Sequence, residues 1–295
     1  MKYGVLPPVR AGVCADPDWM VGLARHAEAC GFESVVLVEH PVVVSGYTSR
    51  YPYAESGRMP LPDDCALPDP VDVLAFLAAA TSRLKLATGV LVLPAHHPVI
   101  MAKRLATVDA LSKGRVRLCI GVGWMREELE ACGIDFGSRG RRTDECIDVL
   151  RALWADTEPG GAAFEGEFFR FAGAHSHPKP HRRGGIPIHI GGHSAASIRR
   201  AARRGDGWHP LGLRGPALAR AVGQLHDEAV AAGRDPEAIE LTLTGVSTGT
   251  SAETVAELED AGVDRLVVTC LQSDLAAAKD ELSQVAQTVA LAPAP

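Results

Sequence analysis

The chain has 295 residues, 46% of them hydrophobic, so it can bury a large core and is far from a disordered composition. Its 30 basic and 36 acidic residues give a formal net charge of −6, and no basic stripe interleaved with aromatic residues occurs, which argues against a nucleic-acid partner. Neither a signal peptide nor a run of about 20 apolar residues is present. We therefore expect a soluble, cytoplasmic protein without a membrane partner.

Seven cysteines are present, an odd number, and no CxxC motif occurs. This pattern predicts neither a zinc ribbon nor a disulfide framework. Cys119 and Cys270 lie inside apolar runs, which is typical of small core residues.

Short apolar runs alternate with helical patterns along the whole chain, which predicts one domain spanning residues 1–295. A helical segment follows each predicted strand, and Asp-Pro pairs at 16–17, 69–70 and 235–236 provide possible helix starts, the last of which is also compatible with a turn. The predicted strands span residues 2–6, 34–39, 84–93, 116–121, 187–191, 207–210, 241–247 and 265–269.

Several of these runs, such as SVVLVE and RLVVT, are almost continuously apolar, as expected for parallel strands that are buried on both faces. Eight strand-helix units fit a closed (β/α)8 barrel, a TIM barrel, better than an open doubly wound sheet. No GxGxxG motif follows the first strand, which further disfavours a dinucleotide-binding fold.

Two long segments interrupt the alternation, at residues 41–69 and 155–185. Loops of this length in a compact domain are typical of lids and binding loops, although surface decoration remains an alternative. The first follows a strand, which in a barrel places it on the catalytic face.

The stretch at 84–154 carries HHPVIMAKRLATVDALSKGR, VRLCIGVGW and RGRRTDECIDVLRALW, and residues 187–208 read PIHIGGHSAASIRRAARRGDGW. These segments resemble the bacterial luciferase-like monooxygenase superfamily, in particular its branch that uses the deazaflavin coenzyme F420. The resemblance implies a luciferase-like TIM barrel with an insertion between the fourth helix and the fifth strand that folds over the catalytic face. It also implies a homodimer.

Gly191 and Gly192 leave a predicted strand, and a helix begins near Ser194. Glycines allow close approach of a ligand, and a helix start presents free N–H groups, a combination suited to phosphate. On spacing alone a tight turn is equally compatible. The resemblance assigns these three residues to the phosphate of the cofactor. It also implies that the nearby Gly205-Asp206-Gly207-Trp208 stretch contacts the cofactor.

The second strand ends in Glu39-His40, and an imidazole at this end of a barrel can exchange protons near neutral pH. A structural histidine is the alternative. In the resembling family this position commonly reads Asp-His and lies beside the reactive face of the cofactor. The resemblance therefore implies that His40 is catalytic and that Glu39 belongs to the cofactor site.

The third strand carries Thr88-Gly89-Val90. In the F420-dependent members a bulge here contains a cis peptide bond that backs the cofactor ring, which would correspond to Gly89–Val90. The alternative is a buried strand with a glycine kink.

The fourth strand ends in Gly121-Val122-Gly123-Trp124, where the glycines would let the ring pass close to the backbone and Trp124 would line the pocket. Tyr47 and Tyr51 in the first long loop are further substrate-pocket residues. Glu127 and Glu128 fit first-turn helix carboxylates. The first strand ends without a metal ligand, so we predict no metal site.

These observations favour an F420-dependent oxidoreductase that transfers a hydride between the deazaflavin and a small organic substrate. Because FMN also carries a phosphate and a tricyclic ring, an FMN-dependent luciferase-like monooxygenase is the main alternative. A non-catalytic cofactor-binding paralogue and, less favoured, a barrel metal hydrolase are the others.

Overall fold

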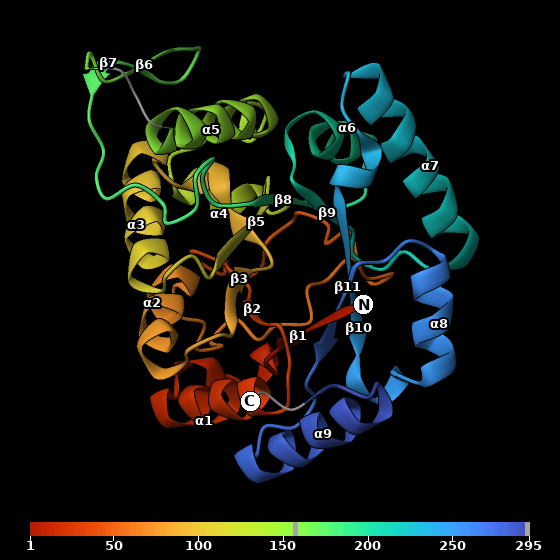
Figure 1. Ribbon diagram of the computed structural model, residues 1–295. Helices are drawn as coiled ribbons and strands as arrows, with labels where there is room; N and C mark the ends of the chain where they lie inside the picture. Colours follow the sequence, from red (N-terminus) through yellow and green to blue (C-terminus); the bar gives the residue numbers. More distant parts are fainter. Residues whose placement is uncertain (156–158, 293–295) are drawn as a thin grey trace.

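A computed structural model describes residues 1–155 and 159–292. Its described residues form a closed barrel of parallel strands surrounded by helices (Figure 1). The barrel strands are β1 (Lys2–Leu6), β2 (Ser34–Leu37), β3 (Lys85–Thr88) continued by β4 (Leu91–Val92), β5 (Val116–Gly121), β8 (Ile188–Gly191), β9 (Gly207–His209), β10 (Glu240–Val246) and β11 (Arg265–Thr269). The predicted TIM barrel is confirmed, and the predicted third strand is split into two short pieces.

The barrel is closed by pairing of its first strand, β1, with its last strand, β11. Strand β1 pairs with β2 on one side and with β11 on the other, and β3 pairs with β5 where the third strand is split. All barrel pairings are parallel, in agreement with the almost continuously apolar strands.

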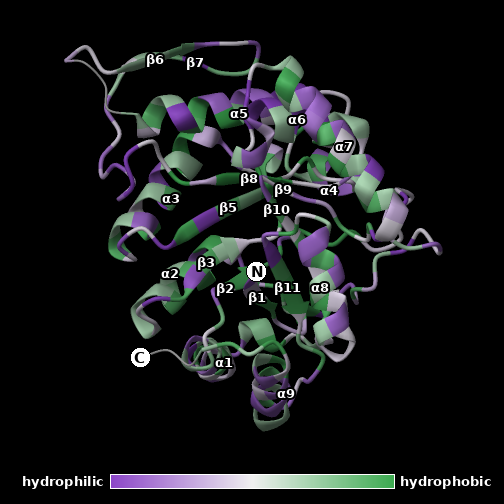
Figure 2. Cartoon of the chain, turned by 45° about the vertical axis from the view of Figure 1, so that its right-hand side comes forward, coloured by the Kyte–Doolittle hydropathy of each residue, from purple (hydrophilic) through white to green (hydrophobic). Residues whose placement is uncertain are grey.

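The helices cover the outside of the barrel, and Figure 2 shows hydrophobic and hydrophilic residues alternating along them. Their bounds are α1 (Pro17–Ala29), α2 (Pro70–Ala80), α3 (Pro98–Leu111), α4 (Arg126–Ala131), α5 (Arg139–Trp154), α6 (Ala195–Arg204), α7 (Gly215–Ala231), α8 (Ala252–Asp260) and α9 (Leu275–Thr288). The unit predicted as the fourth helix therefore consists of two, α4 and α5. Among the described residues no helix combines the length and the apolar character that a membrane crossing requires.

Two of the predicted helix starts are N-caps of long helices. The carboxylates of Asp16 and Asp69 accept hydrogen bonds from backbone N–H groups in the first turns of α1 and α2. Asp235 caps only the short 3-10 turn Pro236–Ala238, so the turn alternative holds there.

The main hydrophobic core lies between the strands and the helices, because alternate strand residues point outward to the helix layer. Inside the barrel the apolar filling is small: Val36, Ala87 and Val267 form a separate cluster. Buried polar side chains, including Arg117, Arg265 and His209, come from the same strands. The barrel interior is therefore unusually polar, and this polar filling connects two cavities, one at each end.

The insertion between α5 and β8 forms an antiparallel hairpin of β6 (Ala162–Glu165) and β7 (Arg170–Ala174). Figure 1 shows the hairpin outside α5, away from the ring of strands. Phe169 at its turn packs edge-on against His97, and Arg142 of α5 lies over the same phenyl ring. The hairpin is therefore packed on the outer layer of helices.

Candidate active site

A cavity of about 1080 Å³ opens at the carboxyl ends of the barrel strands. We call it the mouth cavity. Its walls come from the residues that follow β2, β3, β5 and β8, together with residues 48–53 of the first long loop. This end of a TIM barrel carries the active site in essentially every characterised enzyme of the fold.

His40 lines the mouth cavity and is paired with a buried carboxylate. Its Nδ1 lies 2.9 Å from Oε1 of Glu128, whose side chain is 0% exposed. With an ionised Glu128, which can only accept, Nδ1 is the donor of this hydrogen bond and Nε2 is the nitrogen that can exchange a proton. The second oxygen of Glu128, Oε2, has no hydrogen-bond partner among the described residues.

Glu128 was not predicted as a site residue, yet a signal was present in the residue pattern. Met125, Glu128, Leu129 and Cys132 have the i, i+3, i+4, i+7 spacing of one helical stripe, and Glu128 is the single charged residue on that apolar stripe. The structure buries Glu128 and Leu129 together on the inner side of α4. The first-turn position expected for Glu128 is confirmed, but its side chain is buried and directed at His40.

Glu39 lines the cavity, but both of its oxygens are engaged by the protein. Oε2 accepts a hydrogen bond of 2.6 Å from the backbone N–H of Val92, and Oε1 lies 2.9 Å from Nε2 of His96. The side chain thus ties the end of β2 to β4. In this arrangement Glu39 shapes the cavity wall, and each of its oxygens already accepts one hydrogen bond from the protein.

The bulge between β3 and β4 contains a cis peptide bond between Gly89 and Val90, as the family resemblance implies. The Val90 side chain projects between two strand ends. A Cβ atom built on Gly121 would lie 2.6 Å from one Val90 methyl group, and one built on Gly191 would lie 2.5 Å from the other. These two glycines therefore make room for Val90 and also line the cavity, and Val90 forms the floor of the cavity.

Two predicted site residues lie behind the wall. Thr88 is buried, and its Oγ1 both donates to the carbonyl of Cys119 and accepts from its N–H, which fixes β3 to β5. Tyr47 is also buried, and its hydroxyl accepts a hydrogen bond from the Met59 N–H. Neither residue is among those that line the mouth cavity. Both support the site rather than face it.

The loop before α6 forms one corner of the cavity. Gly192 adopts φ +88°, a left-handed conformation that favours glycine, and Ser194 caps α6 by accepting a hydrogen bond from the Ser197 N–H. Trp208 is fully buried and donates from Nε1 to the Gly192 carbonyl. Asp206 precedes β9 and therefore lies at the opposite end of the barrel, so only part of the 205–208 stretch supports this corner.

An aromatic group closes one side of the cavity. The rings of Tyr47 and Tyr51 lie 5.3 and 5.2 Å from the Trp124 ring, both edge-to-face, and Tyr53 contacts Tyr51 and His193. Trp124 and Tyr51, both predicted, line the cavity. His193 also lines it, and its buried Nδ1 has no partner among the described residues.

Glu127 fastens the first long loop to α4. Its carboxylate accepts hydrogen bonds from the hydroxyls of Ser49 and Thr48 and from their backbone N–H groups. These bonds, with those from Ser49 foremost, hold the pKa of Glu127 at about 2. The loop segment that lines the cavity is therefore held in place by an ionised side chain.

Two arginines that the sequence analysis did not single out give the cavity a positive edge. The guanidinium groups of Arg126 and Arg139 lie 4.4 and 3.7 Å from the centre of the Phe136 ring, and all three residues line the cavity. Burial, and then repulsion by Arg126 and Arg200, lowers the pKa of Arg139. A negatively charged ligand group would relieve this repulsion.

His209 lies on the cavity floor, where its Nε2 is 2.8 Å from Oγ1 of Thr244. Burial, reinforced by the positive charges of Arg117 and Arg265, lowers the pKa of His209 to about 3. The ring is therefore neutral at physiological pH and differs in character from His40.

The insertion does not contribute to this cavity. Among its described residues, 155 and 159–185, none lines the mouth, whereas residues 182–185 line a cavity at the other end of the barrel. The expectation that it folds over the catalytic face was wrong, because its hairpin is held outside α5 by Phe169 and by the ion pair between Arg141 and Glu167. In the described part of the chain, no group of three or more His, Cys, Asp or Glu side chains could hold a metal ion.

The fold and the site define a TIM-barrel protein with a ligand cavity at the carboxyl ends of its strands. The family model for luciferase-like monooxygenases matches residues 1–286, and the chain belongs to this family. It is 32% identical over 258 residues to the uncharacterized Mycobacterium tuberculosis protein Rv0940c, covering 88% of this chain and 87% of that protein.

Two further comparisons cover different cofactors. The chain is 33% identical over 199 residues to an FMNH(2)-dependent dimethylsulfone monooxygenase of Pseudomonas fluorescens, covering 65% of this chain and 48% of that enzyme. The solved structure of an F420-dependent secondary alcohol dehydrogenase in complex with an F420-acetone adduct superposes with a TM-score of 0.77 at 18% identity, covering 98% of both chains. At that identity the superposition supports the fold alone.

Proposed function

We propose that this protein is an F420-dependent oxidoreductase that transfers a hydride between the deazaflavin and a small organic substrate. The observation that supports this proposal most directly is the convergence on one cavity of the His40–Glu128 pair, the Val90 bulge and the start of α6. Together they provide a proton-exchanging group, a floor for a flat ring and a site for phosphate.

The lining of the cavity fits a deazaflavin. Val90 and Trp124 offer apolar surface to a ring, and the α6 start with Ser194 suits a phosphodiester. Arg126 and Arg139 form a second positive region in the same cavity. F420 carries carboxylates in its tail besides its phosphate, whereas FMN carries a single phosphate, so two positive regions favour F420.

When bound, the deazaflavin supplies the carbon that accepts or donates the hydride. If a hydride leaves a carbon that bears a hydroxyl group, the oxygen must release a proton. His40 takes that proton at Nε2, and Glu128 stabilises the resulting imidazolium through Nδ1. The aromatic group around Trp124 orients the substrate and keeps water from it.

The first test is equilibrium binding of F420 and FMN, side by side, to the purified protein. Tight F420 binding with weak FMN binding is the expected result. Turnover is then measured by the absorbance of F420 with a panel of alcohols and carbonyl compounds. The substitution His40→Asn should leave F420 affinity almost unchanged and lower turnover by about 10²–10⁴-fold. Full turnover in a His40→Asn variant that binds F420 normally would contradict the proton-transfer role.

Glu128→Gln tests the partner of His40. Glutamine keeps an acceptor for Nδ1 but removes the negative charge that stabilises the imidazolium. A hydrogen bond to a charged group is worth about 1.5–3 kcal/mol, so turnover should fall by up to about 150-fold and its pH profile should shift. Glu130→Gln is the matched control, because Glu130 lies on the same helix and is half exposed. Equal effects of the two substitutions would show that Glu128 acts only through the stability of α4.

The second candidate function is an FMN-dependent monooxygenase. It is favoured by the 33% identity to the FMNH(2)-dependent dimethylsulfone monooxygenase. Preferential binding of FMN, together with oxygen consumption, would support it over the F420 proposal. Cofactor that binds but is never reoxidised by any substrate would instead indicate a non-catalytic paralogue.

We also propose a homodimer, as expected from the resemblance. Large apolar side chains are exposed on the adjacent helices α2 and α3, among them Phe76 at 48%, Ile100 at 62% and Leu111 at 73%. Ile100 and Leu111 are three helical turns apart and so share one face. Light scattering on the wild type and on Ile100→Lys should give a dimer and a monomer, respectively.

A further inference from the structure

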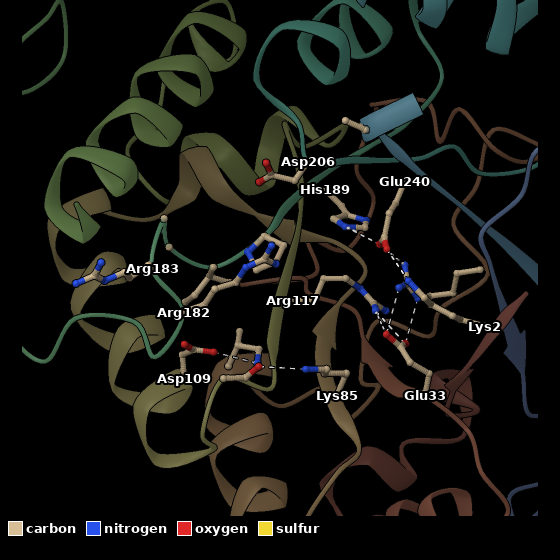
Figure 3. A pocket seen from close by; sticks show the side chains of 18 residues that line it. Lys2, Glu33, Lys85, Asp109, Arg117, Arg182, Arg183, His189, Asp206 and Glu240 are labelled. Atoms are coloured by element: carbon tan, nitrogen blue, oxygen red, sulfur yellow. Dashed lines mark hydrogen bonds and ion pairs between the residues drawn. The ribbon is translucent and has the colours of Figure 1, made fainter. Parts of the chain in front are cut away.

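A second cavity, of about 510 Å³, lies at the amino ends of the barrel strands. We call it the basal cavity. It is formed by the starts of β1, β3, β5, β8, β10 and β11 and by residues 182–187, where the insertion returns to the barrel (Figure 3). Its size suits a small molecule rather than a macromolecule.

Cationic side chains outnumber carboxylates around this cavity, although the chain as a whole has a net charge of −6. Residues 182 and 183 bring two of the cations from the insertion. The cationic residues that line the cavity are Lys2, Lys85, Arg117, Arg182, Arg183 and Arg265. The anionic residues are Glu33, Asp109, Asp206 and Glu240.

The carboxylates of the cavity are engaged by the protein itself. Glu33 is shared by Arg117 and Arg265 at 2.8–3.1 Å, and Glu240 accepts from Lys2 and Arg265. Burial alone would raise the pKa of Glu33, but the two arginines hold it at about 2.

The other two carboxylates are engaged by backbone N–H groups. Asp109 accepts hydrogen bonds from the N–H groups of Val116 and His181, and Asp206 accepts one from that of Ile188. All four carboxylates are therefore held by the protein, and Asp206 also lies 3.5 Å from the Arg151 guanidinium. Six cations against four carboxylates still leave the cavity lining positive.

Two of the cations have no carboxylate partner and face the cavity. Lys85 donates from Nζ only to the Gly114 carbonyl, at 3.1 Å. The guanidinium group of Arg182 has no hydrogen-bond or ion-pair partner among the described residues, and only its backbone carbonyl is engaged, by the Gly185 N–H. Figure 3 shows Arg182 directed toward the ion pairs around Arg117, whereas the neighbouring Arg183 points away from them.

His189 adds a buried donor. Its side chain is 2% exposed and lines the cavity, and its Nε2 lies 3.6 Å from the nearest Glu240 oxygen, beyond a hydrogen bond. Burial, then the charges of Arg117 and Arg265, lowers its pKa well below the usual range, so the ring is neutral and retains one N–H to donate.

We propose that the basal cavity binds a small phosphate-bearing anion between Arg182, Lys85 and His189. A guanidinium fork and an ammonium group are the side chains that recognise phosphate oxygens best, and a neutral imidazole N–H complements them. The anion would join the end of the insertion to the base of the barrel. This site is separate from the cofactor phosphate site at the mouth and does not depend on the proposed function.

The test uses inorganic pyrophosphate, titrated calorimetrically into the full-length protein at low ionic strength, with a thermal melt recorded in parallel. The wild type should bind it and melt at a higher temperature. Arg182→Glu should weaken binding by at least about tenfold, since it replaces an attraction with a repulsion. Lys85→Met, which keeps the length of the side chain, should weaken it by about three- to tenfold.

Arg183→Glu is the matched control, with the same charge change at the neighbouring residue that points away, and its effect should stay below about threefold. Circular dichroism confirms that each variant is folded. Equal losses in Arg182→Glu and Arg183→Glu would overturn the site in favour of a diffuse field. Loss in Ser194→Ala but not in Arg182→Glu would place the pyrophosphate at the mouth, and no binding by the wild type would also overturn the proposal.

Discussion

The two ends of the barrel are built from the same strands, but the buried ion-pair cluster at the base and the buried polar atoms at the mouth differ in how completely they are paired. At the base, Glu33, Arg117 and Arg265 satisfy one another within 3.1 Å. At the mouth, Glu128 and His193 each keep a buried polar atom without a partner among the described residues. Unpaired buried groups cost stability, so they persist where a ligand completes them. The contrast indicates that the Glu33–Arg117–Arg265 cluster at the base stabilises the barrel, whereas the unpaired buried atoms at the mouth are completed by a bound molecule.

The largest expected effect is the loss of stability when the ion pairs at the base of the barrel are broken. Arg265→Met removes one partner from each of the partly exposed carboxylates of Glu33 and Glu240 and the charge of a buried arginine, which should lower the free energy of unfolding by up to about 3 kcal/mol. Urea unfolding followed by circular dichroism measures the change. Arg170→Met is the control, because Arg170 pairs with Glu165 on the exposed hairpin, and no measurable change is expected. Similar losses in both variants would refute the stabilising role of the base.

Lowering the pH should reduce the free energy of unfolding through two neutral histidines, one at each end of the barrel. The pKa of His209 at the mouth is lowered to about 3 and that of His189 at the base is lowered as well, both chiefly by burial. Between pH 6.5 and 4.5 the unfolded chain binds protons at these positions and the folded chain does not, so stability falls as pH falls. Each histidine contributes up to about 1.4 kcal/mol per pH unit.

Glu33 stays ionised in that window, because its folded pKa is about 2, and its own loss follows only below pH 4.5. Urea unfolding at a series of pH values should therefore show a slope that His209→Gln and His189→Gln each reduce. An unchanged slope in His209→Gln would mean that its ring is already charged in the folded protein.

The smallest expected effect comes from a change beside Val90, at the floor of the mouth cavity. Gly121→Ala would place a Cβ 2.6 Å from a Val90 methyl group, and overpacking of this kind costs about 1–3 kcal/mol. F420 affinity should fall with it, since Val90 would move. The double variant Gly121→Ala/Val90→Ala should recover part of both losses, because the three atoms nearest to the new Cβ among the described residues all belong to the Val90 side chain. Independent, additive effects would contradict the contact between the two residues.

The sequence predicted the strands well because their signals are local. Runs such as RLVVT are apolar throughout, and β1, β5 and β11 have the predicted bounds. The break between β3 and β4 and the outward position of the insertion depend on contacts between distant segments, such as that of Phe169 with His97. No periodicity encodes such contacts.

The site was predicted in part for the same reason. His40, Trp124, Tyr51 and Ser194 follow from their place after a strand or in a long loop, and the structure brings them to one cavity. The hydrogen-bond partners of the site residues could not be predicted in this way. Whether Glu39 or Glu128 faces a free partner depends on the Val92 N–H and on the rotation of α4, neither of which the residue pattern fixes.

Strand β1 pairs with β11, from Lys2 with Arg265 to Leu6 with Thr269, across almost the whole length of the chain. During synthesis β1 and β2 can associate early, but the other edge of β1 stays open until residues 265–269 have been made. Pairing between such distant segments is slow, and an open parallel edge is prone to association with other chains. The open edge of β1, which favours aggregation, is therefore covered only after β11 has been synthesised.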